Sequence, residues 1–133
     1  MEIFFTNPDE VPLPPGEVRI RTLQTQVLPD GKRVKVYLEV EPFQMRPNVD
    51  LTIFSPSARM LSTTSIIESM IRKIELVMHL RGEIEAGMHT LEVTVFYATL
   101  PEQDAPEGEG ESIVRQIVDT ASHQFEIPGA PPE

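Results

Sequence analysis

The chain has 133 residues, about one domain, and its 40% hydrophobic and 24% charged residues are ordinary for a globular protein. Its formal net charge of −10 argues against binding to nucleic acid or to an anionic membrane surface, because both are negatively charged. The absence of cysteine excludes disulfides, thiolate zinc sites, iron–sulfur clusters and a cysteine nucleophile. With no apolar run of membrane-spanning length and no signal-peptide pattern, the sequence predicts a soluble, cytoplasmic protein.

Thirteen prolines divide the chain, and a proline cannot sit inside a central strand or helix. Seven of them lie near the ends and predict a Pro-rich arm over residues 1–16 and a Pro-rich tail over residues 128–133. The other six break residues 17–127, the predicted domain, into short segments. Segments of this length suit strands and leave little room for long helices.

The clearest strand pattern lies at residues 33–41, where every second residue is apolar. A strand over residues 18–28 precedes it, and the turn sequence Pro29-Asp30-Gly31-Lys32 predicts a hairpin between the two. Further alternating segments follow at residues 49–54, 74–80, 91–97 and 123–127.

Two segments allow both a helix and a strand. Residues 65–73 begin with the Ser-x-x-Glu spacing of a capping box and continue with apolar residues at helical intervals, which indicates a short helix. The alternative is a strand over about residues 59–67 that turns into the next strand, and we prefer it because strands surround this segment. Residues 112–120 fit one face of a helix, and they also fit one strand of a long hairpin whose tip is acidic.

Seven or eight short strands without βαβ alternation predict an all-β, antiparallel sandwich. Within residues 17–127, three stretches resemble the middle of an immunoglobulin-like β-sandwich of the fibronectin III or macroglobulin-domain kind: Asn48 to Pro56, Ile74 to Leu76, and Gly87 to Val93. The resemblance implies that fold class. It leaves the function open, because such folds serve in adhesion, structure, metal transport and as domains appended to enzymes.

Known catalytic motifs are missing from the sequence. It contains no phosphate-binding Gly-x-x-x-x-Gly-Lys-Ser/Thr loop, no Gly-x-Ser-x-Gly elbow and no His-Glu-x-x-His helix. Residues 108–111, Gly-Glu-Gly-Glu, lack the third glycine of a dinucleotide site. We therefore expect a protein that is not an enzyme and has no cofactor.

Two features could hold a cation. The dipeptides Met78-His79 and Met88-His89 combine ligands that suit copper, but neighbouring residues on a strand face opposite ways. The run 102–111 has five acids in ten residues without the spacing of a calcium-binding loop. We expect no metal site; the candidate ligands, should one exist, are His79, His89, Glu107, Glu109 and Glu111.

Strand alternation also assigns Tyr37, Phe54, Val77 and Phe96 to the outer faces of the sandwich. Gathered on one sheet, they would form an interaction face; alternatively, the arm residues 3–5 or the segment 65–73 cover them. The sequence therefore predicts a non-catalytic protein-interaction or structural module. Its partner would be an unidentified protein or, through an edge strand or sheet face, a second copy. A sandwich that binds a small ligand or a Ca or Cu ion is the alternative.

The surplus negative charge is confined to one part of the chain. Residues 1–81 hold ten basic and ten acidic residues, whereas residues 82–133 hold Arg115 against eleven acids. The sequence thus predicts a neutral N-terminal part that could meet a partner of either sign, and an acidic C-terminal part that favours solubility or basic surfaces.

Overall fold

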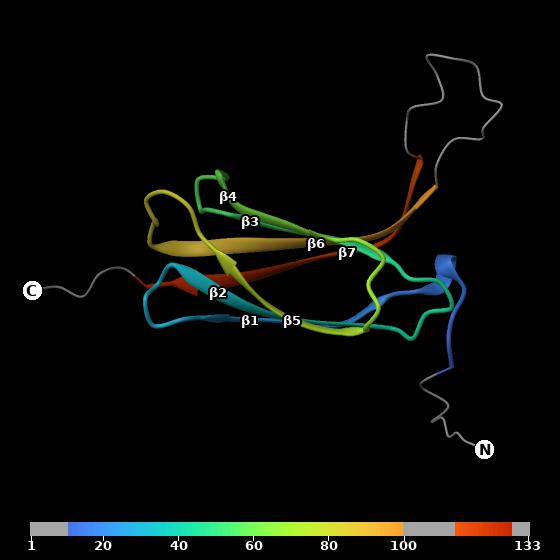
Figure 1. The fold of residues 1–133 in the computed structure, drawn as a ribbon. Helices are drawn as coiled ribbons and strands as arrows, with labels where there is room; N and C mark the ends of the chain where they lie inside the picture. Colours follow the sequence, from blue (N-terminus) through green and yellow to red (C-terminus); the bar gives the residue numbers. More distant parts are fainter. Residues whose placement is uncertain (1–10, 100–113, 129–133) are drawn as a thin grey trace, which may run out of the picture.

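The computed structural model describes residues 11–99 and 114–128, which form two antiparallel sheets packed face to face (Figure 1). The predicted all-β sandwich is therefore confirmed, with seven strands in the described part of the chain. In chain order the strands are β1 (Ile20–Val27), β2 (Arg33–Val40), β3 (Asn48–Phe54), β4 (Met60–Ile66), β5 (Lys73–His79), β6 (Gly87–Thr99) and β7 (Val114–Ile127).

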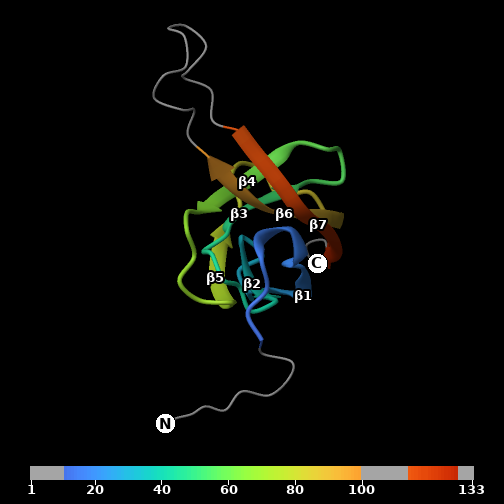
Figure 2. The same ribbon diagram turned by 90° about the vertical axis from the view of Figure 1, so that its right-hand side faces the viewer.

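One sheet has the strand order β1-β2-β5 and the other the order β4-β3-β6-β7. Seen end-on, the two sheets form two separate layers (Figure 2). The predicted hairpin joins β1 to β2, and its turn uses Gly31 at a φ of 68° while the carboxylate of Asp30 accepts a hydrogen bond from Lys32 N. Glycine suits this turn because it adopts positive φ without steric cost.

Alternate residues of the central strands fill the space between the sheets. On β2, the four apolar residues of the predicted pattern, Val34, Val36, Leu38 and Val40, are all fully buried. They face the equally buried Val49, Leu51 and Ile53 of β3 and the apolar series of β6. The period of two read from the sequence thus identifies the core.

The alternative of a helix over residues 65–73 is wrong, and the preferred strand is present as β4. The Ser65 hydroxyl, which would cap such a helix, donates instead to the Asp50 carboxylate at 2.6 Å on the neighbouring strand. Glu68 N donates to Asn48 Oδ1 at 2.8 Å, and Glu68 itself has a φ of 49°. Side chains of β3 therefore take the hydrogen bonds that a helix start would need.

The ambiguous residues from 114 to 120 are also in a strand. β7 runs without interruption from Val114 to Ile127, because it pairs with β6 along its whole length. The register shifts once, between Val95 and Phe96. Together the two strands form a long hairpin that extends beyond the rest of the sandwich (Figure 1).

Described residues before β1 lie against the sandwich. Leu13, within the proline-rich segment 1–16, exchanges backbone hydrogen bonds of 2.9 Å with Pro42 O and Gln44 N and packs against the core. A single 3-10 turn, η2 (Pro15–Glu17), follows it. No helix in residues 11–99 or 114–128 is long and apolar enough to cross a membrane.

Candidate interaction surface

The loops β2–β3 and β4–β5 meet at the end of the sandwich from which the β6–β7 hairpin projects, where Ser69 N donates to Pro47 O (Figure 1). Four large apolar side chains on these two loops are exposed. They are Met45 (58% exposed), Ile67 (68%), Met70 (74%) and Ile71 (58%), and we call them the loop-end cluster. Scattered exposed apolar residues are common on proteins, but a group of four on adjoining loops is the kind of feature that marks a contact surface.

The β4–β5 loop that carries three of these side chains is held by hydrogen bonds. Ser69 is buried; its backbone N donates to Pro47 O at 2.8 Å, and its hydroxyl donates to Ile71 O at 2.6 Å. The buried Asn48 side chain accepts from Glu68 N. Since the polar groups of the loop bond inward, its apolar side chains remain outside in a defined arrangement.

The β2–β3 loop is fixed by the buried residue Tyr97, whose hydroxyl donates to Met45 O at 2.9 Å. Burial raises the pKa of Tyr97 above its ordinary value, because the charged phenolate is poorly solvated there. The hydrogen bond that holds Met45 in the cluster therefore requires the neutral form of Tyr97.

We expect Tyr97→Phe to lower the free energy of unfolding by about 1 kcal/mol at neutral pH, since Met45 O loses its donor. The pKa of Tyr97 is higher in the folded state than in the unfolded state, where it is about 10. The stabilisation from its hydroxyl is therefore fully present below about pH 10, and it is lost as the pH rises through the folded-state pKa. The difference in the free energy of unfolding between wild type and Tyr97→Phe should therefore become smaller above about pH 10. Urea unfolding at several pH values measures it, and a difference that stays constant through the alkaline range would contradict the assignment.

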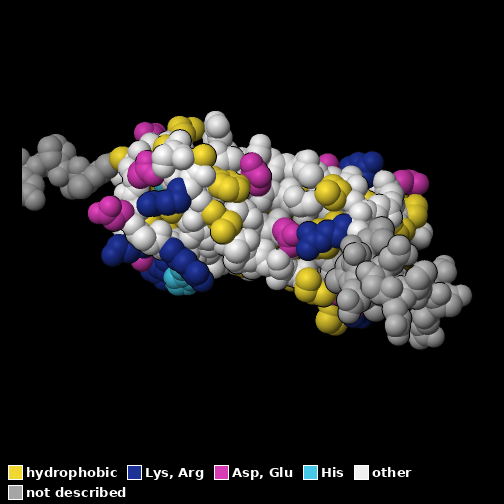
Figure 3. Space-filling view, turned by 90° about the horizontal axis from the view of Figure 1, so that it is seen from above, with side chains coloured by type: hydrophobic (Ala, Val, Ile, Leu, Met, Phe, Trp, Pro, Cys, Tyr) yellow, Lys and Arg dark blue, Asp and Glu magenta, His cyan; other side chains and the backbone are white. Residues whose placement is uncertain are grey.

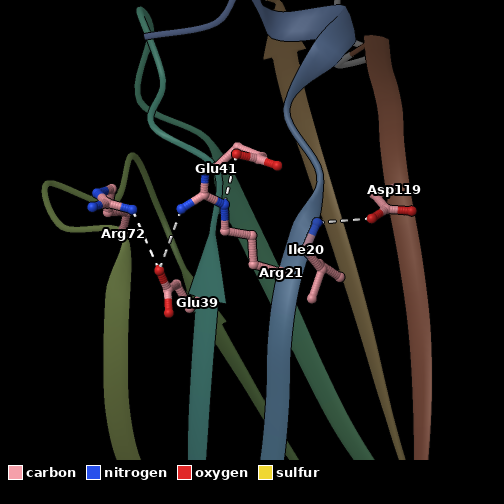
Figure 4. A network of polar contacts seen from close by, with 6 residues as sticks. All are labelled: Ile20, Arg21, Glu39, Glu41, Arg72 and Asp119. Carbon is pink, nitrogen blue, oxygen red and sulfur yellow. Dashed lines mark hydrogen bonds and ion pairs between the residues drawn. The ribbon is translucent and has the colours of Figure 1, made fainter. Parts of the chain in front are cut away.

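Charged residues beside the cluster form a network on the three-stranded sheet (Figure 4). The Glu39 carboxylate lies 3.4 Å from Arg72 and 3.8 Å from Arg21, and Arg21 also pairs with Glu41 at 2.7 Å. Because Arg72 follows Ile71 directly, these ion pairs connect the end of the loop to β1 and β2. In the sequence, exposed Arg46 follows Met45, exposed Glu68 follows Ile67 and exposed Lys73 comes two residues after Ile71, so charges of both signs flank the cluster.

The four residues predicted to form an interaction face do not lie on one face. Tyr37 and Val77 are on the outer side of the three-stranded sheet, at neighbouring positions on β2 and β5. Phe54 and Phe96 belong to the other sheet, at opposite ends of the β3–β6 pairing. Phe96 is only 3% exposed, with the Arg115 guanidinium 4.5 Å above its ring, so it contributes no exposed surface.

The outer side of the four-stranded sheet is mostly uncharged and polar, with hydrophobic side chains scattered over it (Figure 3). A shallow depression of about 570 Å³ lies on this side where β3 and β6 meet the β3–β4 turn. The three-stranded sheet has a smaller one, of about 340 Å³, beside Tyr37. The smaller depression is lined mainly by polar side chains, including the ion pair of Lys35 and Glu75 at 3.4 Å, and so lacks the apolar lining typical of a small-molecule site. The lining of the larger depression includes Phe54, Pro56, Met88, Glu92 and Gln124.

The described candidate metal ligands lie in different surroundings. His79 is exposed at the end of β5, opposite Arg33, whereas His89 is fully buried and stacks on Phe125 with ring centroids 5.6 Å apart. His89 Nδ1 lies 3.0 Å from Gly87 O, and its Nε2 has no hydrogen-bond partner within the described part of the chain. Residues 11–99 and 114–128 contain no group of three or more His, Cys, Asp or Glu side chains that could hold a metal ion. Glu107, Glu109, Glu111 and the arm residues 3–5 lie outside the described ranges.

The sequence did not predict the loop-end cluster, although three of its four residues lie close together in the sequence. Ile67, Met70 and Ile71 have the helical spacing that supported the alternative of a short helix over residues 65–73. In the structure the same residues belong to an irregular loop, which leaves them exposed. Exposure of this kind depends on how the loop is anchored to β3, and no local pattern encodes that.

No protein-family model matches the chain, and no curated protein matches it. One solved structure with a similar arrangement is the apo structure of a β-glucuronidase from Ruminococcus gnavus, with a TM-score of 0.40 and 12% sequence identity. The match covers 84% of this chain and only 16% of that chain. Fold and surface together define a β-sandwich protein with an exposed apolar end.

Proposed function

We propose that this chain is a non-catalytic protein-interaction or structural module built on an immunoglobulin-like β-sandwich. The strand order supports the fold assignment. Immunoglobulin-type sandwiches place the first, second and fifth strands in one sheet and the third, sixth and seventh in the other, as here. The fourth strand pairs with the third in this chain, whereas in constant-type domains it joins the first sheet.

The observation that carries the proposal is the loop-end cluster. Its side chains are exposed, yet its loops are held by hydrogen bonds to Asn48, Pro47 and Tyr97. A surface that is fixed before binding loses little conformational entropy when a partner covers it. Methionine and isoleucine suit such a contact because they bury apolar area, and methionine adapts to the shape of the partner.

A photo-crosslinking residue at position 70 would identify the partner in cells, with one at the similarly exposed Met88 as control. Met88 lies near the start of β6, at the opposite end of the sandwich. The captured protein would then be purified and its affinity measured by calorimetry. We expect Met70→Asp to weaken binding about tenfold or more, because a charge would be buried in an apolar contact, and Met88→Asp to leave it unchanged.

Two results would overturn the proposal. One is a partner whose affinity is the same for wild type and Met70→Asp. The other is the absence of any protein that crosslinks at position 70 more than at position 88. Circular dichroism of both variants would show that they remain folded.

A further inference from the structure

Each sheet edge presents backbone N–H and C=O groups that can pair with another strand, and proteins usually protect such edges with charge or cover. In this sandwich the four edge strands are β1, β5, β4 and β7. β1 and β7 lie next to each other, and Ile20 N donates to the Asp119 carboxylate at 2.8 Å across them. β5 carries Lys73, Glu75 and His79 on its outer face. Three of the four edges are therefore covered or charged.

β4 differs from the other three edges. Residues 60–67, Met-Leu-Ser-Thr-Thr-Ser-Ile-Ile, contain no charged residue, no proline and no glycine. Among the described residues, β4 has one backbone hydrogen bond besides those of its pairing with β3. Arg81 N donates it to Leu61 O, at 3.1 Å. Residues 62–66 therefore form an uncharged edge, rich in β-branched residues, to which a further strand could be added.

The charges on either side of this edge indicate which strand fits it. Arg59 immediately precedes the uncharged stretch and Glu68 immediately follows it; both are exposed, and the Arg59 guanidinium also donates to Glu83 O at 2.7 Å. When two copies of β4 lie antiparallel about Thr63, Arg59 of each copy lies opposite Ile67 of the other, next to its Glu68. A parallel arrangement would place like charges together at both ends, which is unfavourable.

We propose that two copies of this chain associate through antiparallel pairing of their β4 strands, with a two-fold axis at Thr63. The two four-stranded sheets then form one continuous sheet of eight strands. The contact is self-complementary, as a two-fold interface requires, and Met60 of one copy comes close to Ile66 of the other. This inference rests on the proposed function, since it names a second copy as one partner of an interaction module.

Sedimentation velocity of the full chain over the micromolar to millimolar range tests the pairing. We expect the wild type to dimerise and Thr63→Lys to weaken dimerisation about tenfold or more, because it puts a charge on the pairing edge. The matched control is Thr120→Lys, at an exposed threonine of β7. It should dimerise like the wild type.

Charge reversal separates this contact from any other. Arg59→Glu and Glu68→Arg should each weaken the dimer, whereas the double variant should restore it, because opposite charges meet again across the two-fold axis. Thermal unfolding monitored by circular dichroism would show that every variant is folded. Hydrogen exchange should also slow at residues 62–66 as concentration rises.

A monomeric wild type at every concentration overturns the inference, and so does a dimer that Thr63→Lys leaves intact. Association into species larger than a dimer also contradicts it, since two-fold pairing uses up the β4 edge. None of these results bears on the partner protein whose binding is weakened by Met70→Asp. Failure of the β4 pairing and failure of the proposed function are therefore distinguishable.

Discussion

Replacing Leu51 with alanine is expected to lower the free energy of unfolding by about 3 kcal/mol. Leu51 is fully buried on β3, a central strand of the four-stranded sheet, where it pairs with Val93 of β6 and Thr64 of β4. Truncation removes apolar contacts and leaves a cavity that the central strand cannot move to fill. Chemical denaturation with linear extrapolation measures the loss.

The neighbouring residue provides the control for this change. Thr52 points to the outer side of the sheet, where its hydroxyl lies 3.2 Å from that of Thr63. We expect Thr52→Ala to cost less than about 1 kcal/mol, since the hydrogen bond it removes is exposed to solvent. Equal losses at the two positions would mean that β3 does not face the core as described.

Replacing Asp119 with alanine is expected to cost about 2 kcal/mol, because the residue joins the two sheets. Its carboxylate on β7 accepts a hydrogen bond from Ile20 N, at the start of β1 (Figure 4). The same carboxylate also accepts from Thr120 N. Removing it leaves the partly buried Ile20 N–H without this acceptor. The free energy of unfolding of wild type and Asp119→Ala, from chemical denaturation, gives the size of this loss.

Two further variants would test the cause of that loss. Asp119→Asn keeps an acceptor oxygen and should lose clearly less stability than Asp119→Ala. Asp30→Ala removes an exposed carboxylate that also accepts a backbone hydrogen bond, from Lys32 N, but within a single turn. Its loss should be smaller than that of Asp119→Ala, and a larger loss would show that connecting the sheets contributes little.

Much of the fold could be predicted from residues close together in sequence. On β2 the alternation of Val34, Val36, Leu38 and Val40 with polar residues identifies both the strand and its buried side. The hairpin turn at Gly31 follows from the same local chemistry. These features were predictable because a half-buried strand imposes its period directly on the sequence.

Features that depend on distant residues could not be predicted in this way. Ser65 and Glu68 have the spacing of a helix cap, but the side chains of Asp50 and Asn48 bind them instead. Phe96 follows the register shift in the β6–β7 pairing and lies under Arg115, so simple alternation misjudged its exposure. The candidate surface depends on such long-range contacts, and the sequence alone therefore did not reveal it.

The direction of the first and last strands has a mechanical consequence. β1 and β7 both run away from the end of the sandwich at which the β6–β7 hairpin projects, and they lie beside each other (Figure 1). A tensile force applied at residues 11 and 128 would pull these two strands past one another lengthwise. Contacts loaded in this shear geometry resist together rather than opening one after another. The carboxylate of Asp119, bound to Ile20 N, would bear part of that load.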